Sequence, residues 1–311
     1  MPETASETPI RCRGLVKRFG DVVAVNGVDL EVRRGECFGL LGPNGAGKTT
    51  TIEILEGLTP ADAGEVEVLG ASWAHDGHRL RQRLGVSLQE TQLHDKLTVA
   101  ETIRLFASFY ERSRDPAEVI SRLALDEKRD ARVGKLSGGQ KQRLAVACAL
   151  VGDPEVLFLD EPTTGLDPQS RIQLWDQIVG FRQQGGTVLL TTHYMDEAER
   201  LCDRVAIVDH GKVIALGTPR ELIDSLHAAN VIEFACEPEL AEDLLRSVPG
   251  AAELRRHGPN WRLAVDALTE SVPALLAVVE QAGSRLLNLS THRSTLEDLF
   301  ISLTGRALRE E

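Results

Sequence analysis

The sequence has no long hydrophobic run and no excess of positive charge, and each absence excludes a class of protein. Its longest unbroken apolar stretch runs from Leu144 to Val151, well short of the roughly 20 residues that a membrane-spanning helix needs. The chain carries 35 Lys and Arg against 47 Asp and Glu, a formal net charge of −12. Such an acidic chain lacks a general electrostatic attraction for nucleic acid or anionic lipid. We therefore expect no membrane-spanning segment and no nucleic-acid partner.

Cysteine is scarce, and its spacing is typical of neither a disulfide framework nor a zinc site. The cysteines are odd in number, widely scattered and never arranged as CxxC, which favours reduced, buried thiols. The segment from Met1 to Thr8 has neither the basic start nor the apolar stretch of a secretory signal. These absences predict a cytoplasmic protein. The cysteines in question are Cys12, Cys37, Cys148, Cys202 and Cys236.

What the sequence does contain is an alternation of strand-like and helix-like segments. Its 311 residues allow about two domains. Short apolar runs rich in β-branched residues predict buried strands, and longer segments with helical spacing lie between several of them. That order is typical of an α/β fold with a mainly parallel sheet covered by helices. The strand-like runs are 66–69, 156–159, 187–192 and 205–208, and the helix-like segments are 49–58, 140–151 and 170–184.

Both ends of this α/β region show a different pattern. Near the start, two strand-like pieces at 22–25 and 28–32 with a Gly-bearing turn predict an antiparallel extension at the sheet edge. After Gly217 the pattern changes, and we place a domain boundary near residue 228. Residues 229–311 follow the order βαββαβ and then a helix, which resembles a small α+β unit of the ferredoxin-like type. The sequence therefore predicts one domain at 1–228 and a second at 229–311.

Residues 42–49 match the phosphate-binding pattern GxxxxGK[ST] between an apolar run and a helical one. In this setting the glycines let backbone N–H groups turn onto phosphate oxygens, and the helix N-terminus adds its partial positive charge. Lys48 would reach the β- and γ-phosphates, and the Thr49 hydroxyl would bind Mg²⁺. The alternative is a Gly-rich turn that matches by chance. The predicted nucleotide-binding residues are Gly42, Pro43, Asn44, Gly45, Ala46, Gly47, Lys48, Thr49 and Thr50.

Two carboxylates follow the strand-like run at 156–159. Because ligands gather at the carboxyl ends of parallel strands, we expect Asp160 and Glu161 to face the nucleotide. Asp160 would hold the Mg²⁺ shell, while Glu161 would orient and partly deprotonate a water in line with the γ-phosphorus. Taken alone, such a pair after a strand is more often a solvated turn. The phosphate-loop pattern upstream favours the catalytic interpretation.

About twenty residues before this pair stands Leu136-Ser137-Gly138-Gly139-Gln140, and with it the chain resembles an ATP-binding cassette (ABC) ATPase. The resemblance covers roughly residues 10–225. It implies a P-loop NTPase fold with a helical subdomain at about 90–150, and it implies hydrolysis of ATP with Mg²⁺ as cofactor. A P-loop kinase, the other phosphate-loop enzyme considered, has no such segment.

The same resemblance implies roles for residues at matching positions. Gln89 resembles the Q-loop glutamine, which touches the metal and the attacking water, and His193 resembles the switch histidine, which contacts the γ-phosphate. Asp167 lies in a segment that resembles the D-loop. Phe19 stands near the position of a tyrosine on which the family stacks adenine, and its ring can stack without a hydroxyl. A core position for Phe19 is the alternative, and it leaves open whether the base is adenine or guanine.

The resemblance also implies a composite site. Ser137 and the amides of Gly138 and Gly139, ahead of a helix starting near Gln140, form a second anion site without a phosphate loop of its own nearby. Family members pair head to tail, so that each ATP lies between one phosphate loop and the partner's segment. The simplest partner is a second copy in a two-fold homodimer, closed by ATP binding and released by hydrolysis. The metal ligands implied are Thr49, Gln89 and Asp160.

The closing and opening of such a dimer must act on another protein, and the resemblance implies that this protein is a separate multi-spanning permease. In the family the docking groove lies near the Q-loop, here about Glu90 to Leu97 and Val99 to Tyr110. Phe106, Phe109 and Tyr110 either line this groove or lie in the subdomain core. The tail from Thr295 to Arg306 resembles that of drug-resistance exporters, such as those for daunorubicin.

From this tail we expect an exporter of drug-like or hydrophobic compounds, peripheral on the inner face of the cell membrane, with an assembly or regulatory role for residues 229–311. Two alternatives stay open. An importer ATPase would share every catalytic residue. A soluble ABC ATPase acting on ribosomes or nucleic acid is disfavoured, because the chain has one cassette and no zinc module or coiled coil inserted in it.

Overall fold

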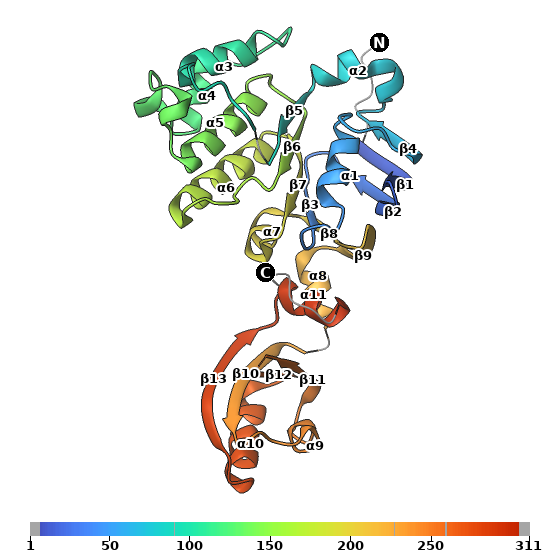
Figure 1. Ribbon diagram of the computed structural model, residues 1–311, viewed down its shortest axis with the longest axis vertical. Helices are drawn as coiled ribbons and strands as arrows, with labels where there is room; N and C mark the ends of the chain where they lie inside the picture. Colours follow the sequence, from blue (N-terminus) through green and yellow to red (C-terminus); the bar gives the residue numbers. More distant parts are fainter. Residues whose placement is uncertain (1–6, 90, 227, 259, 305–311) are drawn as a thin grey trace. The chain divides into compact units, whose positions relative to one another are not determined.

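The computed structural model describes residues 7–89, 91–226, 228–258 and 260–304, and the chain divides after Thr218 into two compact units (Figure 1). The boundary predicted near residue 228 lies too late in the chain. Helix α8 (Pro219–Asp224) belongs to the second unit because it packs against helix α11 (Leu296–Thr304).

A six-stranded sheet forms the centre of the first unit, in the order β5-β6-β7-β3-β8-β9. The first five strands are parallel, as the sequence predicts, and β9 closes the edge antiparallel to β8. Every residue of β3, β6 and β7 is buried, because helices cover both faces of a parallel sheet. The strands are β3 (Cys37–Leu41), β5 (Leu84–Ser87), β6 (Val156–Asp160), β7 (Thr187–Thr192), β8 (Arg204–Asp209) and β9 (Lys212–Gly217).

The antiparallel edge sheet that the sequence predicts is a separate three-stranded sheet in the order β2-β1-β4. The two pieces expected at 22–25 and 28–32 form one continuous strand, β2 (Val22–Val32), which pairs with β1 (Ile10–Phe19) across register shifts. The run at 66–69 lies in β4 (Ala63–Val68), which also pairs with β1 rather than joining the parallel sheet. Pairing partners far apart in sequence decide this arrangement, and local patterns do not report them.

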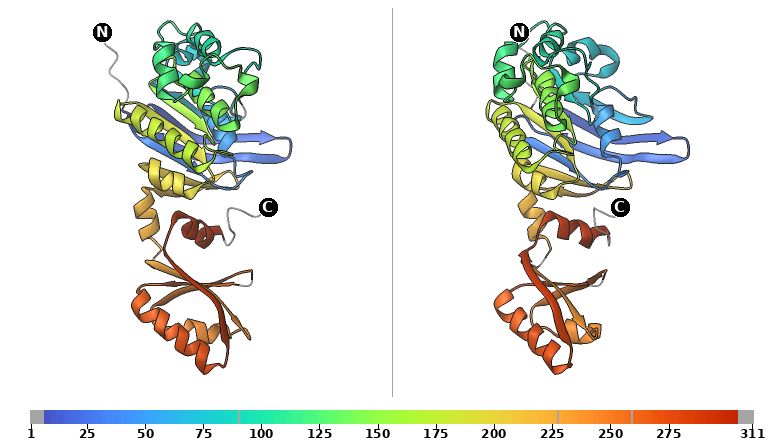
Figure 2. Two further views of the ribbon diagram at one scale, coloured as in Figure 1. Left: turned by 90° about the vertical axis from the view of Figure 1, so that its left-hand side faces the viewer. Right: turned by 60° about the vertical axis from the view of Figure 1, so that its left-hand side comes forward.

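Helix α1 (Lys48–Leu55) lies between the two sheets and contacts strands of both. Figure 1 shows α5, α6 and α7 on the opposite side of the parallel sheet from α1. The segment between β5 and β6 carries α3 and α4 and two short 3-10 turns before α5 (Figure 2). The remaining helices of this unit are α2 (Trp73–Arg81), α3 (Val99–Ala107), α4 (Pro116–Arg122), α5 (Gly138–Leu150), α6 (Pro168–Gln183) and α7 (Met195–Leu201).

The second unit has the βαββαβ order that the sequence predicts, with α11 after it. Its sheet order is β11-β12-β10-β13 with every neighbouring pair antiparallel, which is the ferredoxin-like arrangement. Leu245 of α9 and Leu275 of α10 pack on Phe234 in one buried cluster. The elements are β10 (Asn230–Glu237), α9 (Glu242–Arg246), β11 (Ala251–His257), β12 (Asn260–Val265), α10 (Leu268–Gln281) and β13 (Arg285–Arg293).

Candidate active site

The loop between β3 and α1 turns the backbone tightly at glycine positions. Gly47 caps α1 with φ 99°, and a side chain there would meet the Ala24 carbonyl oxygen at 2.2 Å. Gly45 also has a positive φ of 79°, but the space beside its Cα is open. A side chain at Gly42 would likewise meet the Val208 carbonyl oxygen at 2.2 Å. The loop therefore has two glycines pressed against the fold and one facing open space, which leaves room for a phosphate group to approach the backbone.

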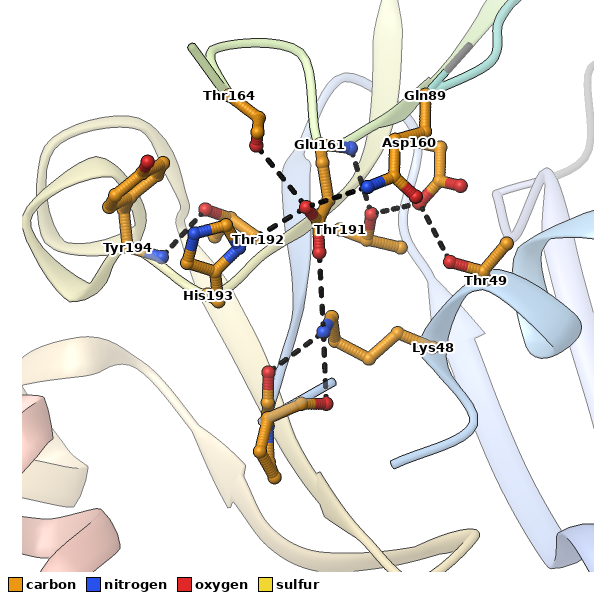
Figure 3. Close-up of polar contacts among 12 residues, drawn as sticks. Lys48, Thr49, Gln89, Asp160, Glu161, Thr164, Thr191, Thr192, His193 and Tyr194 are labelled. Atoms are coloured by element: carbon orange, nitrogen blue, oxygen red, sulfur yellow. Dashed lines mark hydrogen bonds and ion pairs between the residues drawn. The ribbon is translucent and has the colours of Figure 1, made fainter. Parts of the chain in front are cut away.

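Lys48 opens α1 and points back over this loop (Figure 3). Its Nζ donates to the carbonyl oxygens of Gly42 at 2.8 Å and Pro43 at 3.2 Å, and it lies 3.4 Å from Glu161 Oε1. Burial lowers the pKa of Lys48, although the charge of Glu161 opposes that change. The ammonium group is therefore fixed at the mouth of the loop by acceptors of its own chain.

Asp160 is the last residue of β6, and a threonine network holds it (Figure 3). Thr49 Oγ1 lies 3.3 Å from Asp160 Oδ1, and Thr191 donates a short hydrogen bond to the same oxygen. Burial raises the pKa of Asp160, and the hydrogen bonds from both threonines oppose that rise. Thr191 also accepts from the Glu161 backbone N–H at 3.0 Å. The Thr191 hydroxyl thus links the backbone of Glu161 to the side chain of Asp160.

Four side chains meet at the carboxylate of Glu161 (Figure 3). Its backbone has φ 46°, and the residue is 6% exposed. Oε2 lies 3.2 Å from His193 Nδ1 and accepts from Gln89 Nε2 at 3.3 Å and Thr164 Oγ1 at 3.2 Å. Burial disfavours the charged form, but the hydrogen bond from His193 and the charge of Lys48 outweigh it and lower the pKa of Glu161. The carboxylate is therefore ionised at neutral pH.

The segment at 136–140 forms the N-terminus of α5 at a separate place in the first unit. Ser137 Oγ accepts from the Gln140 backbone N–H at 3.3 Å, and Gln140 Oε1 accepts from the Ser137 N–H at 3.0 Å, a reciprocal cap. Gln140 lines a hollow of about 580 Å³ that Asp167 also lines. Asp167 caps α6, and a hydrogen bond from the Ser170 hydroxyl lowers the pKa of its carboxyl. Gly138 and Gly139 lie in the first turn of α5.

Phe19 ends β1 and is 52% exposed. The alternative that it is a core residue is therefore wrong. The Nζ of Lys17 lies 5.4 Å from the ring centroid and pairs with Asp62 Oδ1 at 3.1 Å. The ring is available to stack on a planar group, and the contact with Lys17 adds a positive charge beside it.

A cavity of about 620 Å³ lies beside the end of β5, and we call it the Q-loop groove. Phe106, Phe109 and Tyr110 all line it, and Phe109 is 59% exposed, which favours the groove over the core for these rings. Glu90, where the predicted groove begins, lies outside the described residues. The groove is lined by Glu56, Leu58, Trp73, His78, Arg81, Gln82, Leu84, Val86, Leu88, Thr91, Gln92, Phe106, Phe109, Tyr110 and Cys148.

Comparison with known proteins settles the family. Residues 25–164 match the family described as ABC transporter. The Nod factor export ATP-binding protein I of Burkholderia lata is 41% identical over 309 residues, which cover 97% of this chain and 99% of that protein. This chain belongs to the ABC transporter family. It is an ATP-binding subunit of the family, whose members hydrolyse ATP.

Solved structures of ABC cassettes agree with the fold. The ATP-binding subunit of an ABC transporter has a TM-score of 0.65 at 29% identity, covering 70% of this chain and 93% of that chain. A cassette solved as a dimer in a post-hydrolysis state with ADP and Pi has a TM-score of 0.61 at 24% identity, over 67% of this chain and 98% of that one. At that identity the second match shows the fold alone. Within the residues that the structure covers, no helix of this ABC protein is long and apolar enough to span a membrane.

Sequence reasoning brought Lys48, Asp160, Glu161, Gln89 and His193 to one place, and the structure does the same. It missed two threonines. Thr164 and Thr191 each hold an acid of the pair. The consecutive threonines that end β7 were the available signal, because hydroxyls at the carboxyl end of a parallel strand face the ligand edge.

Proposed function

We propose that this ABC protein hydrolyses ATP with Glu161 as the general base and uses the energy to drive a separate permease for export. The observation that carries the proposal is the ionised, buried Glu161 carboxylate within 3.4 Å of Lys48 Nζ and 3.2 Å of His193 Nδ1. A general base must be unprotonated at the working pH so that it can accept a proton from the attacking water, and the lowered pKa of Glu161 keeps its carboxylate in that form. Gln89 and His193, which share Oε2, would then orient the water and contact the γ-phosphate.

The residues around Asp160 fit Mg²⁺ bound together with phosphate. Among the described residues there is no cluster of three His, Cys, Asp or Glu side chains that could hold a metal by itself. Thr49 Oγ1 and Asp160 Oδ1 lie 3.3 Å apart and could both bind one Mg²⁺ ion. Mg²⁺ commonly takes few protein ligands and completes its coordination shell with phosphate and water. Gln89 would be the third protein ligand. The ion would neutralise charge on the β- and γ-phosphates.

The nucleotide would lie along the loop from Gly42 to Thr50, with Lys48 leaving its carbonyl acceptors for the phosphates. Open space beside Gly45 supports this placement. The exposed ring of Phe19 supports stacking of the base. ATP rather than GTP is proposed because the relatives are named ATP-binding proteins.

We infer that the complete site needs a second copy of the chain. Ser137 and Gln140 cap α5 by hydrogen bonds to one another, and Gly138 and Gly139 lie in its first turn. In a two-fold dimer this helix N-terminus of one copy would face the γ-phosphate held by the other. Asp167, which lines the same hollow as Gln140, would lie at that interface.

The partner in transport would be a multi-spanning permease on the inner face of the membrane, seated in the Q-loop groove. Export is supported by the name of the Burkholderia lata relative, Nod factor export ATP-binding protein I. For this chain we propose a hydrophobic or drug-like cargo, on the resemblance of its tail. Residues 219–311 would serve assembly or regulation.

The test uses the full chain with Glu161→Gln, which keeps the shape of the side chain and removes the base. ATP turnover should fall by about 10²-fold or more, while ATP binding persists and a dimer accumulates on a sizing column. The exposed acid Glu118 of α4 provides the control, because Glu118→Gln should hydrolyse ATP at the wild-type rate. Rapid ATP turnover by Glu161→Gln would show that Glu161 is not the base. A Glu161→Gln protein that stays monomeric at saturating ATP would contradict the composite site.

The transport part of the proposal needs native membranes. Solubilised membranes incubated with Glu161→Gln and ATP should yield a multi-spanning protein on affinity capture. Ribosomes or nucleic-acid proteins in its place would contradict the transporter assignment and leave the hydrolytic residues untouched.

A further inference from the structure

His193, the residue proposed above to contact the γ-phosphate, is the last of three side chains that contact one another in series. Figure 3 shows Tyr194 beside His193, and their ring centroids lie 4.1 Å apart with the planes tilted by 41°. The guanidinium of Arg171 lies over the Tyr194 ring, with its central carbon 4.5 Å from the ring centroid. Such contacts between a cation and a ring, and between two rings, are attractive and depend on orientation.

Tyr194 occupies a backbone position at which tyrosine gives the helix no cap. It stands between β7 and α7 as the N-cap of the helix, and its side chain makes no cap hydrogen bond. Its backbone N–H donates to Thr192 Oγ1 at 2.9 Å, which fixes the turn. Caps of this kind favour Ser, Thr, Asp or Asn, because their side chains satisfy the first helical N–H groups. At this position the tyrosine instead supplies an aromatic ring to its histidine neighbour.

Arg171 is fixed at both its backbone and its side chain. Its backbone N–H donates to the Asp167 carbonyl oxygen at 3.0 Å in the first turn of α6. Its Nη1 lies 3.4 Å from Asp196 Oδ2 on α7, and the side chain is 22% exposed. A planar guanidinium can pair with a carboxylate and contact a ring at the same time, which an ammonium group does less well. Arg171 therefore joins α6 to the segment that carries His193.

The contact with Tyr194 restricts a ring that has one other close polar contact. His193 Nδ1 lies 3.2 Å from Glu161 Oε2, and a ring held at that single atom could still tilt about it. The neighbouring tyrosine ring limits this tilt. With Nδ1 directed at Glu161, the opposite edge of the imidazole presents Nε2 to the γ-phosphate. Hydrolysis is sensitive to such orientation, because a displacement of about 1 Å at a reacting group can lower the rate strongly.

We propose that Tyr194 and Arg171 are positioning residues that hold the His193 ring in the orientation needed for ATP hydrolysis. This inference rests on the proposed function, in which His193 contacts the γ-phosphate. Both residues act through His193 and not on the nucleotide. Their loss should therefore lower kcat, while ATP affinity, to which the phosphate loop contributes most, should change little.

A second contact between the same two helices provides a matched control. Arg200 of α7 lies over the ring of Trp175 of α6, 5.2 Å from its centroid. This contact is also between a cation and a ring, but it lies near the other end of α7 from His193. If these contacts only pack α6 against α7, removal of either arginine should have the same effect. If Arg171 positions His193, only its removal should slow hydrolysis.

The experiment measures steady-state ATP hydrolysis and equilibrium ATP binding for four variants of the full chain. Tyr194→Leu, which keeps an apolar side chain but loses the ring, should lower kcat by about tenfold. Arg171→Ala should lower kcat by about threefold. Tyr194→Phe keeps the ring and should restore nearly the wild-type kcat, and Arg200→Ala should have the wild-type kcat. The Kd for ATP should stay within about twofold of wild type in all four.

The double variant Tyr194→Leu with Arg171→Ala should hydrolyse ATP as fast as Tyr194→Leu alone, because Arg171 acts through the tyrosine ring. Four results would overturn the positioning role: a wild-type kcat in Tyr194→Leu, an equal loss in Tyr194→Phe, an equal loss in Arg171→Ala and Arg200→Ala, or a loss of ATP affinity that matches the loss of kcat.

His193→Ala in the same assay separates this inference from the function on which it rests. If kcat falls in His193→Ala but not in Tyr194→Leu, the positioning role is wrong and the hydrolytic role of His193 stands. A wild-type kcat in His193→Ala would overturn both, since there would then be no catalytic histidine for Tyr194 to position.

Discussion

Replacement of Glu56 by glutamine should make the protein more stable, by an amount that grows with pH. The carboxyl of Glu56, which is buried at the end of α1 and has no hydrogen-bond partner among the described residues, has a pKa near 4.5 in an unfolded chain and about 8 in the folded one. Below pH 4.5 both states hold the proton. Between these two values the unfolded chain gains the free energy of ionisation and the folded chain does not, so the free energy of unfolding of the wild type falls as pH rises.

The size of the effect follows from about 1.4 kcal/mol for each pH unit. Relative to a side chain that does not titrate, Glu56 costs about 3 kcal/mol at pH 7 and about 5 kcal/mol above pH 8. Glutamine has nearly the same shape but no proton to lose. Its amide also lacks partners in the groove, which adds a penalty that does not change with pH. The prediction therefore concerns how the difference in free energy of unfolding between Glu56→Gln and wild type changes with pH, and not the size of that difference at one pH.

Urea denaturation of the full chain, followed by tryptophan fluorescence at each half pH unit from 5 to 9, measures this slope. The stability of Glu56→Gln minus that of wild type should rise up to about pH 8 and then become constant. Glu53→Gln is the control and should show no such rise, because Glu53 has Thr59 as a partner. A difference between Glu56→Gln and wild type that is flat with pH, or that falls, would refute the buried, unpaired state of Glu56.

Three other substitutions test the catalytic edge. Lys48→Ala should weaken ATP binding by about 10²-fold through loss of charge-assisted contacts, measured by equilibrium dialysis, and unchanged affinity would contradict the phosphate role. Ser137→Arg should bind ATP normally but neither dimerise nor hydrolyse it, and normal turnover would contradict the composite site. Thr191→Val keeps the side-chain shape but loses the hydrogen bonds to Asp160 and to the Glu161 N–H. ATP turnover should therefore drop about tenfold with little change in ATP affinity. A wild-type rate of turnover would show that these hydrogen bonds do not position the two acids.

Local sequence patterns were sufficient where a residue's place depends on its neighbours in the chain. The apolar strands at 156–159 and 187–192 end in the acids and threonines that the structure places at one sheet edge. The phosphate loop lies between a strand and a helix, as its pattern requires. Parallel strands bring their carboxyl ends together whatever the connections between them, and so the sequence indicated that the predicted catalytic and metal-binding residues lie close together.

The same patterns failed where pairing across the chain decides the structure. The piece at 66–69 is a strand, as predicted, but its partner is β1, more than fifty residues earlier. The two pieces at 22–25 and 28–32 appeared separate because Gly27 interrupts the apolar run, whereas Gly27 lies within one strand at φ 76°. The domain boundary was placed too late because α8 looks like the end of the first unit, and only its packing on α11 assigns it to the second.

The sequence by itself determined the order of elements, the phosphate loop, the acid pair and the segment at 136–140, since each depends on residue types at short fixed spacings. Tertiary structure alone decided the state of each side chain. Glu161 is ionised because Lys48, Gln89, Thr164 and His193 converge on it from other segments. Glu56, with the same carboxyl group, tends to hold its proton because the fold buries it and brings no cation to it. The charge of a carboxyl depends on the atoms around it in space, and residues distant in the chain supply those atoms.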